Sequence, residues 1–196
     1  MSKIFSNKKK IVLISITGII VIVALVLTLL LSSYRDLRKE IIPLCEEYIE
    51  YLEVSFPEDM ISKTVDQREE IASRILAEKR EVYDQLFSKD VSDYVKGYES
   101  IEKIAQNAVD LKEIVVFAEY SMKEFIGLKK RGNQVEAVFK KHWVARTIEF
   151  NDDGSYGDPQ ENQWDTFYLL VFVYEDDGWK IIDVHWNPFS MEFGVA

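Results

Sequence analysis

The most prominent pattern in the chain is an uncharged apolar run near its N-terminus. Residues 11–31 are mostly isoleucine, valine and leucine, and they include no charged residue and no proline. A helix rises about 1.5 Å per residue, so these 21 residues would span about 32 Å, enough to cross a hydrocarbon core of roughly 30 Å. A lone strand would leave its peptide groups unpaired in lipid. The run therefore predicts a transmembrane helix.

Helical periodicity of the apolar residues continues after this run. Between residues 34 and 54, apolar positions recur at helical spacing among acidic ones, which predicts a juxtamembrane helix that is broken or kinked at Pro43. Apolar stripes opposite charged faces predict a second helix from residue 58 or 62 to residue 87, and a third from 100 to 111. The charged face of the second helix is interpreted as a solvated surface with local ion pairs.

From about residue 113 the apolar period changes from about 3.6 to 2, which predicts β-strands. Turns rich in glycine, asparagine and aspartate separate four predicted strands, at residues 113–128, 134–150, 164–174 and 179–186. Apolar parity in the second strand changes between Phe139 and Val144, so a bulge is predicted near residues 140–143. The sequence thus predicts an α+β fold, in which an N-terminal transmembrane helix precedes a cone-like domain of about three helices and a curved four-stranded antiparallel sheet.

Charge is distributed unevenly on the two sides of the apolar run. Four lysines and no acidic residue precede it, whereas 20 basic and 34 acidic residues follow it. Short basic flanks stay in the cytoplasm, so the C-terminal domain is predicted to be extracytoplasmic. A domain this acidic is expected to avoid nucleic acid. The predicted segments are a basic cytoplasmic tail at 1–10, the transmembrane helix at 11–31, the juxtamembrane helix at 32–56 and the α+β domain at 57–196.

A cleaved signal peptide is the alternative interpretation of the apolar run. Its apolar core is longer than the usual 7 to 15 residues. The exit, Leu-Leu-Ser-Ser-Tyr at residues 30–34, lacks small residues at both positions that define a cleavage site. The sequence therefore favours an uncleaved, single-pass signal-anchor that places residues 11–31 in the lipid bilayer of the cell membrane.

The last predicted hairpin carries the pattern of a known superfamily. Its sequence, Tyr-Glu-Asp-Asp-Gly-Trp-Lys-Ile-Ile-Asp at residues 174–183, resembles the closing strands of the nuclear transport factor 2-like (NTF2-like) superfamily, in which a turn followed by Gly, Trp, Lys and Ile recurs. The resemblance covers roughly residues 44–189 and implies the same cone-like fold. Because that fold hosts enzymes, ligand binders and scaffolds alike, it implies no particular activity.

Two membrane-anchored groups with such a domain are similar to this chain in plan. One comprises the bitopic assembly factors of type IV secretion and conjugation systems, which share the basic tail, the single membrane helix and the external domain. The other is the small domain that precedes amidase domains in Gram-positive surface proteins, although no amidase pattern follows here. Both resemblances imply a bacterial protein whose domain organises other envelope proteins and does not catalyse a reaction.

Histidine and aspartate residues of the predicted strands are the candidates for chemistry. Enzymes of the superfamily use such residues inside the cone for proton transfer, and histidine suits this task because its pKa lies near neutral pH. Aromatic side chains either line the same pocket or fill the core beneath the sheet. The candidate pocket residues are Tyr120, His142, Trp143, Asp165, Asp183 and His185. No recognised catalytic motif accompanies them, so we expect neither an enzyme nor a cofactor.

The loop at residues 151–158 contains the oxygen-bearing side chains that Ca²⁺ prefers. Aligning Gly154 with the turn glycine of an EF-hand places Gln160 where a bidentate glutamate is required, so no metal site is predicted. Cys45 is the only cysteine, which excludes an intrachain disulfide. We interpret it as a small buried apolar residue.

The sequence leads to one principal hypothesis and two alternatives. The principal hypothesis is a single-pass membrane protein whose extracytoplasmic domain binds other envelope proteins, as a scaffold or as an assembly subunit of a secretion or conjugation machine. The first alternative is a small-ligand or catalytic pocket in the cone that uses His142 or His185 with Asp165 or Asp183. The second is an accessory or immunity protein.

Overall fold

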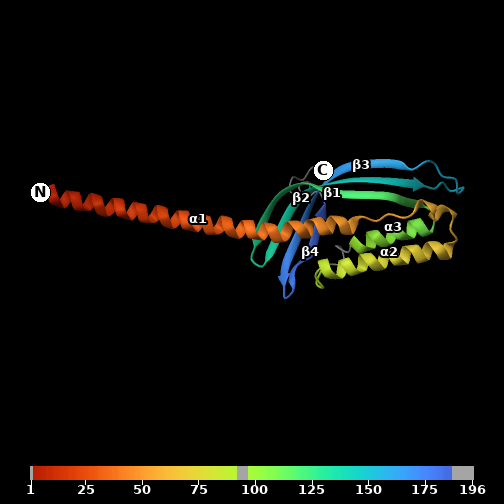
Figure 1. The fold of residues 1–196 in the computed structure, drawn as a ribbon, viewed down its shortest axis with the longest axis horizontal. Helices are drawn as coiled ribbons and strands as arrows, with labels where there is room; N and C mark the ends of the chain where they lie inside the picture. The colour runs from red at the N-terminus through yellow and green to blue at the C-terminus, as the bar shows by residue number, and fades with distance from the viewer. Residues whose placement is uncertain (1, 92–96, 187–196) are drawn as a thin grey trace, which may run out of the picture. The chain divides into compact units, whose positions relative to one another are not determined.

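The computed structural model describes the backbone of residues 2–91 and 97–186, and the side-chain surroundings of residues 22–91 and 101–186. The elements in chain order are α1 (Ser2–Leu52), the 3₁₀ helix η1 (Glu58–Ser62), α2 (Val65–Leu86), α3 (Gly97–Val109), β1 (Glu113–Arg131), β2 (Gln134–Glu149), β3 (Gln160–Glu175) and β4 (Gly178–Trp186). The strands form one antiparallel sheet in the order β1-β2-β3-β4 (Figure 1). The predicted α+β class and the four-stranded antiparallel sheet are confirmed.

The chain divides into two compact units, residues 1–40 and residues 41–196. The predicted membrane segment at 11–31 belongs to the first unit, and the side chains of its first 11 residues lie outside the described surroundings. Over the described residues, no helix is both long enough and apolar enough to cross a membrane. The membrane anchor stays a prediction from the sequence.

Helix α1 continues through Pro43, so of the break or kink predicted there, the break is wrong and the kink stays a prediction. The helix runs without interruption from Ser2 to Leu52 with the proline inside it. An internal proline removes one backbone hydrogen bond and crowds the preceding turn, at a cost of about 3 kcal/mol. A buried stripe offsets this cost, because each fully buried apolar side chain contributes about 1.5–3 kcal/mol. The stripe contains Ile41, Cys45, Tyr48 and Ile49, each at most 3% exposed.

A capping box sets the beginning of α2. The backbone N–H of Gln67 donates to Oγ1 of Thr64, and the backbone N–H of Thr64 donates to Oε1 of Gln67. Such a reciprocal pair satisfies two donors that the first turn of a helix leaves unbonded. The helix therefore begins at Val65, after both of the predicted starts, and the residues before it form η1.

The bulge predicted in β2 is wrong, because the irregular positions lie in β1. Strand β2 pairs with β3 residue for residue from Gln134 to Thr147. The register with β1 shifts at three places, and one of them, between Met122 and Glu124, lies opposite residues 140 and 141. Burial in β2 stays on the odd-numbered residues from Val135 to Thr147, and Ile148 is buried next to Thr147. Lys141 lies on the buried face and interrupts the apolar pattern there.

The sheet of the second unit has one face towards the helices and one face without a described helix. Figure 1 shows α2 and α3 on the same side of the sheet, where α3 contacts β1 and α2 contacts β4. In β2, odd-numbered residues from Val135 to Ala145 lie on this helix-facing face, and most are buried. We call the other side the open face. Its members in β2 and β3 include Val138, Lys140, His142, Val144, Asp165, Leu169 and Val171, all half-buried.

Connecting segments bond to both outer strands of the sheet. Before η1, the backbone N–H of Phe56 donates to the carbonyl oxygen of Val115 in β1 at 2.7 Å. After α2, Phe87 forms a parallel bridge with Ile181 in β4, and the backbone N–H of Ser88 donates to the carbonyl oxygen of Ile181 at 2.9 Å. These bonds occupy part of each strand edge that would otherwise be open to another chain.

Candidate functional site

Four charged or titratable side chains meet at one place on the open face. Asp165 of β3 pairs with His142 of β2, and its Oδ1 atom lies 2.8 Å from Nδ1 of His142. The other carboxylate oxygen, Oδ2, accepts hydrogen bonds from Nζ of Lys140 at 2.8 Å and from Nζ of Lys123 at 2.9 Å. Lys123 is the extra residue of the β1 irregularity. The residue that interrupts the regular pairing of β1 is thus also the third partner of Asp165. We call this group the Asp165 cluster.

The Asp165 cluster keeps its carboxylate ionised. Hydrogen bonds from Lys140, Lys123 and His142 hold the pKa of Asp165 well below its usual range. Two lysines against one carboxylate leave the cluster with a positive charge on an acidic protein.

A second histidine–aspartate contact lies at the far side of the open face. Nε2 of His185 is 2.9 Å from Oδ2 of Asp183, two residues away in β4. His185 lies opposite Leu169, four residues along β3 from Asp165. At about 3.3 Å per residue, the two contacts are separated by about 13 Å along the strand. They share a face without forming one site.

The six predicted pocket residues divide between the two faces of the sheet. The open face holds both histidines and both aspartates, outside the concave side where a pocket was expected. The helix-facing face holds Tyr120 and Trp143, which lie opposite each other in β1 and β2 with ring centroids 6.0 Å apart.

Two rows of aromatic rings cross the helix-facing face. In the first row, Trp143 contacts Tyr120 on one side and Trp164 on the other, with ring centroids 6.0 and 4.0 Å apart. In the second row, Phe139 stacks on Tyr168 at 5.9 Å, and Trp186 lies opposite Tyr168 in β4. Trp164 is 50% exposed and Trp186 is 65% exposed. Both rows therefore extend from the core to the surface.

Lys141 lies between these two aromatic rows. On β2 it falls between Phe139 and Trp143 on the same face, and it is only 5% exposed. Its Nζ lies 4.2 Å from the ring centroid of Tyr120 and 4.8 Å from that of Tyr168. Over the described residues it has no hydrogen bond and no ion pair. Its ammonium is held by the electron-rich faces of two rings.

Burial controls the electrostatics around Lys141. It lowers the pKa of Lys141 to about 8. The two flanking phenols shift the other way, since burial and then the charge of Glu53 raise the pKa of Tyr120, while burial and then Tyr120 raise the pKa of Tyr168 to about 12. At neutral pH the site therefore contains an ammonium and two neutral phenols.

The sequence pattern missed Lys141, although a signal for it was present. Val135, Ala137 and Phe139 set the buried parity of β2, and Trp143 and Ala145 continue it. A single lysine in the middle of such a series indicates a buried charge. The sequence predicts a bulge there instead, because Val144, Ile148 and Phe150 carry the apolar pattern on the other parity.

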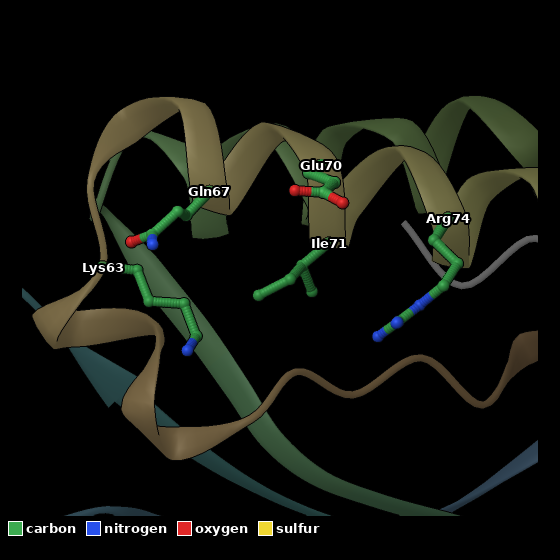
Figure 2. A pocket seen from close by; sticks show the side chains of 5 residues that line it. All are labelled: Lys63, Gln67, Glu70, Ile71 and Arg74. Atoms are coloured by element: carbon green, nitrogen blue, oxygen red, sulfur yellow. The ribbon is translucent and has the colours of Figure 1, made fainter.

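Among the described residues, hollows on the surface occur at the helices. One of about 270 Å³ is lined by Lys63, Gln67, Glu70, Ile71 and Arg74. Figure 2 shows Ile71 and Arg74 extending from α2 over the space beside Lys63. The other, of about 420 Å³, lies between α2 and α3 and includes Ser73, Leu76 and Gln106. Neither hollow includes a predicted pocket residue.

Metal-binding geometry is absent from the described part of the chain, where no group of three His, Cys, Asp or Glu side chains could hold an ion. In the loop at residues 151–158, Oδ1 of Asp153 accepts hydrogen bonds from the backbone N–H of Ser155 at 2.9 Å and from its hydroxyl at 2.6 Å. This contact organises the loop as an Asx turn.

No family model matches the sequence, and no curated protein is significantly similar to it. Similar solved structures include an NTF2-like superfamily protein from Salmonella enterica serovar Typhimurium (20% identity, 54% of this chain, 74% of that chain, TM-score 0.38). An NTF2-like protein involved in plasmid conjugation is 13% identical over 74% of this chain and 46% of that chain, with a TM-score of 0.35. The Kfla4162 protein from Kribbella flavida is 12% identical over 76% and 88%, with a TM-score of 0.39. At these values the likeness assigns no activity to the chain.

Proposed function

We propose that the chain is a membrane-tethered protein-interaction domain. Residues 11–31 would hold the α+β unit at a bilayer, and the open face of the sheet would bind another envelope protein. The domain would act outside the cytoplasm as a scaffold or as an assembly subunit of an envelope machine, of which secretion and conjugation systems are examples.

The observation that carries this proposal is the composition of the open face. Its centre consists of apolar side chains from β2 and β3, and no described helix covers them. A sheet face normally packs against another layer, so an apolar face without one is suited to a partner. The central residues are Val138, Leu169 and Val171, and Val144 lies beyond the Asp165 cluster.

Charged groups border this apolar centre. The Asp165 cluster lies on one side, and the contact between Asp183 and His185 lies on the other. An apolar centre with a polar rim is the usual anatomy of a protein–protein interface. Because the cluster carries positive charge, an acidic partner surface fits this rim best.

The tether is supported by the sequence and by the exposed side of α1. The run at 11–31 is long enough to span a bilayer and is preceded by four lysines. In its described part, Leu29 and Leu31 are 69% and 68% exposed. Apolar side chains this exposed in water favour transfer to a lipid environment.

Site-specific photocrosslinking in cells tests the interaction. Benzoylphenylalanine in place of Leu169 on the open face should give a light-dependent adduct of defined mass. The matched control places the same group at Glu81, an exposed position on α2, and should give none. A Val138→Lys substitution, opposite Leu169, should abolish the adduct while leaving the circular dichroism unchanged. Equal adducts at both positions, or none at Leu169, would refute the proposed interface.

A further inference from the structure

Lys141 is a buried cation whose partners are all uncharged. Removing a charge from water is unfavourable, and buried lysines are ordinarily paired with a carboxylate. Here the described contacts of the ammonium are the rings of Tyr120 and Tyr168, at 4.2 and 4.8 Å. Cation–π contacts supply about 0.5–2 kcal/mol each, which offsets only part of the desolvation.

A purely structural role does not account for a lysine at this position. The neighbouring positions on the same face of β2 are Phe139 and Trp143, and an unbranched apolar side chain would fill the same space without a buried charge. Replacing buried charges by apolar residues is often neutral or stabilising. The ammonium is thus better explained by a negative group that it can bind.

The surroundings of the ammonium restrict that negative group. Tyr120, Trp143 and Trp164 form an apolar wall on one side, and Tyr168 and Trp186 form another. Over the described residues, no second cation contacts these rings on the helix-facing side. A singly charged carboxylate can be neutralised by one ammonium, whereas a phosphate dianion would leave a charge unbalanced in an apolar environment.

We infer that Lys141 anchors a binding site for a carboxylate carried by an apolar group. The ammonium binds the carboxylate, and the rings of the two aromatic rows enclose the apolar part. Entry is at the surface end of the rows, where Trp164 and Trp186 are 50% and 65% exposed. The inference is independent of the proposed membrane tether and of the partner on the open face.

Matched ligand pairs test this site in the full-length protein, solubilised in a neutral detergent. At pH 7, 4-phenylbutyrate and 4-phenylbutanol differ in charge but little in shape, and tryptophan fluorescence follows the binding of each. We expect the acid to bind at least tenfold more tightly than the alcohol. Equal affinity for the two, or no binding of either, would overturn the inference without any substitution in the protein.

Two substitutions test whether Lys141 causes the preference of the protein for the acid over the alcohol. Lys141→Met keeps the length of the side chain and removes its charge, so the acid and the alcohol should bind it equally. Lys141→Arg keeps the charge and should retain a preference for the acid. The Met variant should melt at the same or a higher temperature than the wild type. A Met variant that still prefers the acid contradicts the assignment.

A second pair of ligands identifies the class of molecule that carries the carboxylate. Acetyl-leucyl-phenylalanine with a free C-terminus is compared with its C-terminal amide. If the free peptide binds more tightly than 4-phenylbutyrate and the amide does not bind, the site takes the end of a polypeptide. If 4-phenylbutyrate binds more tightly, the site takes a small organic acid. Both results support a carboxylate site.

Discussion

At the scale of single residues, Asp165 organises the charges of the open face. Three side chains from two strands, Lys123, Lys140 and His142, converge on its two oxygens at 2.8–2.9 Å. Without the carboxylate, the ammonium groups of Lys123 and Lys140 would repel each other. The residue therefore holds together the rim that we propose for partner binding.

The Asp165→Asn variant should be less stable than the wild type at neutral pH. Because the pKa of Asp165 is depressed in the folded protein, its ionised form stabilises the fold above the unfolded carboxyl pKa of about 3.9, and this contribution is lost as pH falls through the folded value. Urea unfolding of both proteins at a series of pH values measures the difference. The difference should shrink steadily below about pH 4, and a constant difference would contradict the role of the charge.

The burial of individual residues is the feature that the sequence predicts least well. The alternation of Val135, Ala137 and Phe139 correctly predicts a strand with one buried face. The same alternation continues through Lys141, but lysine prefers water, so the pattern and the residue type point to opposite faces at this position. The rings of Tyr120 and Tyr168, which are distant in sequence, offset part of the free-energy cost of burying the ammonium of Lys141.

At the scale of elements, a buried arginine joins the ends of two helices. Arg68 of α2 donates from Nε to the carbonyl oxygen of Val109, the last residue of α3, at 2.7 Å. One of its terminal nitrogens donates to the carbonyl oxygen of Lys63 at 2.6 Å, just before the cap of α2. Its planar group can serve both carbonyls at once, which an ammonium cannot do with the same geometry.

An Arg68→Met substitution should destabilise the fold. It leaves two carbonyl oxygens without their donor, at about 1–3 kcal/mol for each oxygen that stays buried. Chemical denaturation measures the loss. The matched control is Arg74→Met on the exposed side of the same helix, which should change stability by no more than about 0.5 kcal/mol. Equal effects of the two substitutions would show that Arg68 does not join the helices.

Element boundaries illustrate what local sequence can and cannot specify. Hairpin turns were placed correctly because Gly132 and Gly178 have positive φ, which glycine adopts without strain. The break predicted at Pro43 failed because Ile41, Cys45 and Tyr48 are buried by residues far along the chain. Such tertiary packing overrides the tendency of proline to end a helix, and it cannot be predicted from the residues next to Pro43 alone.

At the scale of the whole molecule, the proposed membrane topology can be tested by cysteine labelling. Cys45 is fully buried, so a membrane-impermeant maleimide should not label the wild type. Asp158→Cys, in an exposed loop, should be labelled in intact cells or spheroplasts. Ser6→Cys, in the basic segment before the apolar run, should be labelled only after lysis. The opposite pattern, or labelling of both residues in intact cells, would contradict the predicted orientation.

The burial of Cys45 also bears on the redox conditions that the protein can tolerate. Burial, and then the charge of Glu46, raise the pKa of its thiol well above the usual range. The thiolate is the form that attacks disulfides and reacts with oxidants, so this thiol is inert in either a reducing or an oxidising compartment. With no second cysteine to pair with, the domain needs no oxidative folding enzyme. Its native state can therefore form without disulfide chemistry on either side of a membrane.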